Sequence, residues 1–207
     1  GQIAGLANLM TKSIEEMLDQ WETDCDAGKV IDLTGAMMQV TLKVVVKALF
    51  STALSDEDLQ TVGAMFPPLL AATNRRATLP FQWFYALPFS SNKNYRGYIV
   101  KLDQIIFRII RQRRASKEQP MDLLQMLMEA KDDKTGEPLS DHELRNEAMT
   151  MFIAGHETTA NALSWLWGIL SQQTGIRANL EREVDSVLGK KIPKASDYSS
   201  LSYCLKV

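Results

Sequence analysis

Apolar residues recur along most of the chain at intervals of three and four, the spacing that places side chains on one face of an α-helix. β-branched residues cluster only between Val40 and Val46, where Lys43 interrupts them, so strand signals are nearly absent. The sequence therefore predicts an all-α fold. The expected helices cover about 6–24, 32–50, 55 onward, 94–114, 121–130, 140–172 and 177–188.

Polar residues mark where two of these helices begin. Ser140 and Glu143 form a capping box, in which each side chain bonds the other residue's backbone N–H, and Ser55 with Asp58 is a variant of it. No proline follows Ser140 before Pro193, so a helix of about 30 residues, or about 45 Å, is expected. Such a helix crosses a whole domain, and we expect this chain to be part of a larger protein.

The third predicted helix runs into prolines. Pro67 and Pro68 are expected to kink or stop it, and an aromatic-rich loop around 81–85 should follow. These aromatic side chains either pack under the loop, form a lid over an apolar cavity or dip into a membrane. The basic end of the 94–114 helix, which includes Arg113, is expected to be a solvated C-terminus that complements the helix dipole. An anion-binding patch is the alternative.

Composition narrows the function. The chain has 207 residues, 23 Lys and Arg against 25 Asp and Glu, and a net charge of -2, so no nucleic-acid partner is expected. Its two cysteines, Cys25 and Cys204, match no zinc spacing, and no metal ligands are predicted. The uncharged segment 158–176 is long enough to span a bilayer, but its polar residues favour a buried helix. Membrane association is left open.

The middle of the long helix is an unusual choice for packing alone. Gly155 costs about 1 kcal/mol relative to alanine in a helix interior. The Thr158 hydroxyl can bond back to the Ala154 carbonyl and open a bulge, where the Glu157 carboxylate could pass protons into an apolar cavity. A close helix–helix crossing at small residues is the alternative. His156 lacks a second histidine four positions later, so no zinc helix is expected.

The stretch 154–159, Ala-Gly-His-Glu-Thr-Thr inside a long helix, resembles the oxygen-activating motif of cytochrome P450 monooxygenases. Leu49-Phe50 and the segment 197–203 resemble the family's pattern at the corresponding places. The resemblance implies the helical portion of the P450 fold around a long central helix at about 140–172. The flanking sheet and the cysteine loop would be missing, so residues 1–207 are expected to be a helical fragment of a single P450 domain, incomplete at both ends.

The resemblance also implies roles for particular residues. Thr158 and Glu157 would take part in oxygen activation and proton delivery as catalytic residues. Ala154 and Gly155 would let haem and dioxygen approach the helix. The complete protein is expected to hold heme b and to insert one atom of O2 into an apolar small molecule. Its electrons would come ultimately from NAD(P)H, through a reductase or ferredoxin.

Two further expectations concern substrate and compartment. Phe152 and Ile153, just before the motif, are expected to face the substrate. The location is expected to be intracellular, in the cytoplasm of a bacterium or at the endoplasmic reticulum membrane of a eukaryote.

The axial iron ligand of the family is a cysteine thiolate, and neither Cys25 nor Cys204 lies in a matching loop. The complete protein is thus expected to be a monooxygenase, and the 207-residue chain alone to be inactive. The alternative is a non-catalytic, truncated P450-like helical protein without haem, which acts as a structural or binding module.

Overall fold

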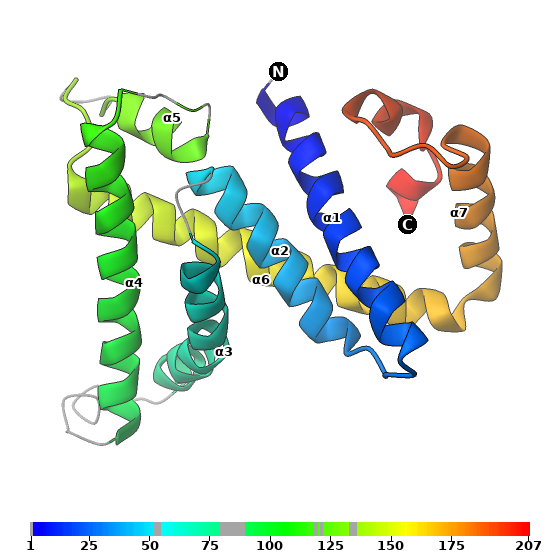
Figure 1. Ribbon diagram of the computed structural model, residues 1–207, viewed down its shortest axis with the longest axis horizontal. Helices are drawn as coiled ribbons and strands as arrows, with labels where there is room; N and C mark the ends of the chain where they lie inside the picture. Colours follow the sequence, from blue (N-terminus) through cyan, green and yellow to red (C-terminus); the bar gives the residue numbers. More distant parts are fainter. Residues whose placement is uncertain (1, 52–54, 79–89, 118–119, 121, 133–135) are drawn as a thin grey trace. The chain divides into compact units, whose positions relative to one another are not determined.

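The computed structural model describes residues 2–51, 55–78, 90–117, 120, 122–132 and 136–207 (Figure 1). Within these residues there is no strand, only an isolated bridge between Lys131 and Pro138, so the all-α prediction is confirmed. The helices are α1 (Gln2–Asp26), α2 (Leu33–Phe50), α3 (Asp56–Thr78), α4 (Ser90–Ala115), α5 (Leu123–Glu129), α6 (Asp141–Gln172), α7 (Thr174–Val187) and the short 3₁₀ helices η2 (Ala195–Ser200) and η3 (Cys204–Lys206).

The chain forms two compact units, residues 1–48 with 153–207 and residues 49–152. In the first unit, buried residues of α2 and α6 make a small core of Met37, Val40 and Ala160. Met17 and Trp21 of α1 pack against this core, so three helices meet there. By length and composition alone α2 could also cross a membrane, but 44% of its residues are buried, as is common for core helices.

The second unit has a larger core. α3 and α4 lie side by side within it (Figure 1). Its fully buried side chains come from several helices, so burial of apolar surface holds the helices together. They include Leu49, Phe66, Ile109, Ile110, Leu124 and Leu144.

The two predicted helix starts are confirmed. Ser140 Oγ accepts the Glu143 N–H at 3.3 Å, and the Glu143 carboxylate accepts the Ser140 N–H at 2.8 Å, which is a complete capping box. Ser55 Oγ likewise accepts the Asp58 N–H at 3.1 Å. These local motifs are decided by neighbouring residues, which is why the sequence reveals them.

The prolines do not stop α3. The helix continues through Pro67 and Pro68 to Thr78, so this alternative of the prediction is wrong. Phe66 and Leu69, on either side of the two prolines, are 2% and 4% exposed. Their burial offsets the backbone hydrogen bonds that the two prolines cannot donate. The predicted aromatic loop at 81–85 lies outside the described residues.

The basic end of α4 also differs from the prediction, because Arg113 is buried rather than solvated. Its guanidinium donates two hydrogen bonds, each 2.7 Å long, to the two carboxylate oxygens of Asp122. Ser51 Oγ donates to the same carboxylate at 2.6 Å. Burial alone would raise the pKa of Asp122, but the hydrogen bonds from Arg113 and Ser51 hold it below its ordinary value.

Candidate functional site

The predicted catalytic segment lies in an unbroken stretch of α6. Thr158 Oγ1 donates a hydrogen bond to the Ala154 carbonyl at 2.6 Å, and Thr159 Oγ1 donates to the Gly155 carbonyl at 2.8 Å. The predicted back-bond of Thr158 is therefore present. The predicted bulge is not, because the backbone stays α-helical from Asp141 to Gln172. The hydroxyl bonds the carbonyl without breaking the helical ladder.

Ala154 and Thr158 lie four residues apart on one exposed face of α6. The Thr158 O–H donates its hydrogen bond to the Ala154 carbonyl. The lone pairs of the hydroxyl oxygen therefore remain to accept a hydrogen bond from a group outside the helix. Glu157 is half-buried and lies about 100° round the helix from Thr158. The structure thus brings the small side chain and the hydroxyl together, with the carboxylate at their edge.

Gly155 faces helix α2 rather than the Ala154–Thr158 face. A Cβ atom added there would lie 3.4 Å from Cγ2 of Val45 on α2. A Cβ at this distance makes an ordinary contact, so α2 leaves room here for a small residue, as the alternative of a close helix–helix crossing supposes. The expected role of Gly155 beside haem stays a prediction.

Phe152 and Ile153 precede the motif and have contrasting environments. Phe152 is 4% exposed, and its ring meets that of Phe66 edge to face with centroids 5.0 Å apart. Ile153 is 36% exposed. Phe152 therefore belongs to the core of residues 49–152. Contact of Phe152 or Ile153 with a substrate stays a prediction.

His156 is the most deeply buried polar group of the motif, with 3% exposure. Burial lowers the pKa of its imidazole, which is therefore neutral at neutral pH. Among the residues that the structure describes, no group of three or more His, Cys, Asp or Glu side chains could hold a metal ion. His156 thus lies on the packed side of α6.

The two cysteines differ in setting. Cys25 is exposed on α1, whereas Cys204 is half-buried at the start of η3. Burial, and then the neighbouring Glu183 carboxylate, raise the pKa of the Cys204 thiol. The thiol is therefore protonated at neutral pH.

Glu183 is a residue whose role the sequence analysis missed. Its carboxylate accepts the backbone N–H groups of Tyr203 at 2.7 Å and Cys204 at 2.8 Å, and the Ser202 hydroxyl at 3.1 Å. Partial burial alone would raise the pKa of Glu183, but these hydrogen bonds lower it to about 2. The contact fixes residues 202–204 to α7.

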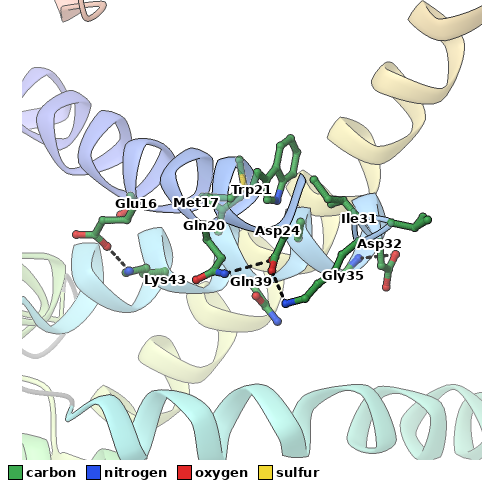
Figure 2. A pocket seen from close by; sticks show the side chains of 15 residues that line it. Glu16, Met17, Gln20, Trp21, Asp24, Ile31, Asp32, Gly35, Gln39 and Lys43 are labelled. Carbon is green, nitrogen blue, oxygen red and sulfur yellow. Dashed lines mark hydrogen bonds and ion pairs between the residues drawn. The ribbon is translucent and has the colours of Figure 1, made fainter. Parts of the chain in front are cut away.

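An open groove of about 360 Å³ lies between α1 and α2 (Figure 2). Figure 2 shows Lys43 of α2 directed at Glu16 of α1, and Gln20 at Asp24. Lys29 also pairs with Asp24 at 2.8 Å. No residue of α6 lines the groove, which is therefore separate from the candidate catalytic segment.

Comparisons with known proteins agree with the motif. A sequence profile described as cytochrome P450 matches residues 2–207. Cyclooctatin synthase of Streptomyces melanosporofaciens is 33% identical over 207 residues, which are 100% of this chain and 44% of that protein. Pentalenene oxygenase of Streptomyces avermitilis is 31% identical over 201 residues, 97% of this chain and 43% of that protein. The chain spans less than half the length of these relatives.

Solved structures show the same fold. The crystal structure of the cytochrome P450DA heme domain matches with a TM-score of 0.82 at 23% identity, over 95% of this chain and 43% of that one. The retinoic acid bound cyanobacterial CYP120A1 matches with a TM-score of 0.78 at 22% identity, over 99% of this chain and 43% of that one. At these identities the likeness concerns the fold alone.

Proposed function

The chain belongs to the cytochrome P450 family, and we propose that the whole protein is a haem-dependent monooxygenase that inserts one atom of O2 into an apolar organic substrate. The observation that carries the proposal is the Ala154–Thr158 face of α6, which is exposed and keeps a hydroxyl oxygen open to a ligand. Residues 1–207 would form the helical middle of a single domain of that protein.

The exposed face of α6 suits a flat cofactor. Ala154 offers only a methyl group, so a haem could lie against the helix at that point and leave room for dioxygen beside Thr158. When bound, haem supplies the redox chemistry that activates dioxygen. Neither Cys25 nor Cys204 lies in a loop that matches the cysteine loop of the family, so we place the axial cysteine outside these residues.

Thr158 and Glu157 would deliver protons on that face. The hydrogen bond to the Ala154 carbonyl fixes the orientation of the Thr158 hydroxyl. Its oxygen can then accept a hydrogen bond from a water molecule. The half-buried Glu157 carboxylate could take a proton from solvent and pass it to that water. The two side chains would thereby deliver protons to a cavity that is otherwise apolar.

The family and the names of the relatives support a proposal for the substrate and the electron donor. Pentalenene oxygenase and cyclooctat-9-en-7-ol 5-monooxygenase are named for reactions on pentalenene and cyclooctat-9-en-7-ol. We propose an apolar substrate of this kind, with electrons from NAD(P)H through a reductase or ferredoxin.

The proposal is tested on the complete protein loaded with haem. After reduction and exposure to carbon monoxide it should show the red-shifted absorption band of a thiolate-bound haem. With ¹⁸O2, NADPH and a surrogate redox partner, pentalenene or cyclooctat-9-en-7-ol should gain one labelled oxygen atom. Uptake of haem without any labelled product from a panel of apolar substrates would contradict the monooxygenase activity.

The lack of a matching cysteine loop favours a second candidate for the 207 residues by themselves, a helical structural or binding module without haem. Haem added to the purified chain, followed by reduction and carbon monoxide, separates the two cases. A thiolate-type band would show that Cys25 or Cys204 ligates iron and would overturn our placement of the axial ligand. Failure of the complete protein to bind haem would favour the module.

A further inference from the structure

Asn161 lies on the Ala154–Thr158 face of α6, and the function proposed above gives it no role. Residues of an α-helix advance by about 100° each, so Asn161 lies about 20° round the helix from Ala154 and about 60° from Thr158. It follows Thr158 by three positions, and the two side chains are therefore neighbours on the helix surface. These relations come from the unbroken α6 itself, so they hold whatever the rest of the protein places against this face.

The Asn161 side chain does not serve the helix that carries it. None of the residues that the structure describes forms a hydrogen bond with its amide. Asn146, the other asparagine of α6, accepts a hydrogen bond from Arg145 Nη1 at 3.0 Å. Asparagine also ranks below alanine and leucine as a helix former. Asn161 thus adds neither a hydrogen bond nor helix propensity to α6.

The hydroxyl groups near Asn161 already donate within the helix. Thr158, Thr159 and Ser164 each donate to the carbonyl four positions earlier, at 2.6, 2.8 and 2.7 Å. A hydroxyl has one O–H, so these three side chains can only accept further hydrogen bonds. The Asn161 amide has two N–H groups. It is therefore a donor within one turn of Thr158 that α6 does not use itself.

A water molecule at the Thr158 oxygen needs such a donor to take one orientation. Water offers two O–H groups and two lone pairs, and an ordered water in a protein typically makes about three hydrogen bonds. One O–H would donate to the Thr158 oxygen. If Asn161 Nδ2 donates to a lone pair of the same water, the second O–H is left to point away from the helix. It then faces whatever ligand lies on the Ala154–Thr158 face.

We propose that Asn161 is a positioning residue of the complete protein, whose amide orients the water at Thr158 for proton delivery. The proposal rests on the monooxygenase function proposed above and adds to it the group that fixes the direction of the proton. An amide neither takes up nor releases a proton near neutral pH, so Asn161 orients the water while Glu157 supplies the proton. Loss of the amide should therefore divert electrons from product without weakening the fold.

The first test uses variants of the complete protein loaded with haem. Asn161→Leu nearly keeps the size of the side chain and removes both polar groups, so product formed per electron should fall several-fold, with peroxide or water formed instead. Asn161→Asp keeps an acceptor oxygen but loses the N–H donor, and should fall in the same way. Asn146→Leu, the same change about four turns earlier in α6, is the matched control and should retain the yield.

Two further measurements separate positioning from a structural role. In the reduced protein exposed to carbon monoxide, a hydrogen bond donated to the bound CO lowers its infrared stretching frequency. That frequency should rise in Asn161→Leu and stay the same in Asn146→Leu. The Tm of Asn161→Leu should not fall, because leucine is the better helix former. A lower Tm with an unchanged CO frequency would make the loss of product structural and would overturn the proposal.

A double variant tests whether Asn161 and Thr158 hold the same water. Thr158→Ala already removes the acceptor, so adding Asn161→Leu should lower the product per electron little further. Full multiplication of the two single losses would show that Asn161 acts elsewhere. Retention of the yield in Asn161→Asp would exclude the N–H as the donor. Either result would overturn the proposal.

The same assays distinguish failure of this inference from failure of the proposed function. If Asn161→Leu retains the product yield while Thr158→Ala loses it, Asn161 has no positioning role and the monooxygenase function stands. If the unsubstituted complete protein binds haem but forms no labelled product from the panel of apolar substrates, the monooxygenase function is wrong and the role of Asn161 falls with it.

Discussion

The Arg113–Asp122 pair and the Ala154–Thr158 face of α6 use polar groups in opposite ways. The side chains of Arg113 and Asp122 are 7% and 2% exposed, and both carboxylate oxygens are bonded. Thr158 is exposed, and within the helix its hydroxyl only donates one hydrogen bond, to the Ala154 carbonyl. The closed pair holds backbone segments in place, whereas the open hydroxyl is available to a ligand. Substitutions should therefore affect stability in the first region and chemistry in the second.

The largest effect is expected from Asp122→Ala. This change leaves the Arg113 guanidinium buried without its partner and removes the acceptor for Ser51. Loss of one member of a buried ion pair costs about 3–5 kcal/mol of unfolding free energy. Urea unfolding of the chain measures the loss. Asp58→Ala, which breaks the more exposed pair with Arg108, should cost no more than about 1 kcal/mol, and equal losses would contradict the distinction between the pairs.

The next effect concerns chemistry in the complete protein. Thr158→Ala should leave the unfolding free energy within about 1 kcal/mol of the original. Product formed per electron should fall by about tenfold or more, with peroxide or water formed instead, because proton delivery loses a positioned hydroxyl. Coupled assays of NADPH, peroxide and product measure the ratio. Thr159→Ala, which removes the matching bond to the Gly155 carbonyl, is the control and should retain the coupling.

Glu157→Gln tests the other half of the same face. The amide cannot hold or release the proton that the carboxylate would pass to the water at Thr158, so turnover should slow while substrate affinity stays nearly unchanged. A turnover number and a substrate Kd, measured on the same preparation, separate the two quantities. An unaltered rate, with a solvent isotope effect that marks proton transfer as limiting, would exclude Glu157 from the relay.

Glu183 provides a smaller, pH-dependent effect. Its pKa is about 2 in the folded chain against an ordinary 4.5, so its contribution to stability is complete above pH 4.5 and is lost as pH falls through about 2. The difference in Tm between the chain and Glu183→Gln should therefore be largest above pH 4.5 and vanish near pH 2. Glu181→Gln, whose partner Arg177 is exposed, should show little difference at any pH. A constant difference for Glu183→Gln down to pH 2 would contradict the anchoring by its charge.

The smallest effect is expected from Gly155→Ala. The new Cβ would meet Val45 at 3.4 Å, an ordinary contact, and alanine favours the helix by up to about 1 kcal/mol. The unfolding free energy should rise by less than about 1 kcal/mol. Gly155→Leu should lower it instead, because the larger side chain cannot fit beside α2. Stabilisation by both changes would show that α2 does not limit the space.

The sequence predicts features whose partners lie within one helical turn. The capping box at Ser140 and the bond from Thr158 to Ala154 belong to this class. It does not predict the burial of Arg113, because the guanidinium bonds groups that are distant in sequence. These are the carboxylate of Asp122, which caps α5, and the carbonyl of Phe50 at the end of α2. Glu183 bonds residues 20 positions away for the same reason. Nor does the sequence predict that α3 continues past Pro67, because core packing outweighs the local cost.

Ser51 shows how one of these contacts restricts the choice of amino acid. Its φ is +55°, a left-handed conformation that β-branched residues adopt only at a high cost. Glycine would relieve the backbone but would lose the hydrogen bond to Asp122, and threonine would keep a hydroxyl at the expense of the backbone. Asparagine tolerates this φ and still offers a donor. Random replacement of residue 51, followed by selection for folded chains, should thus recover mainly serine and asparagine.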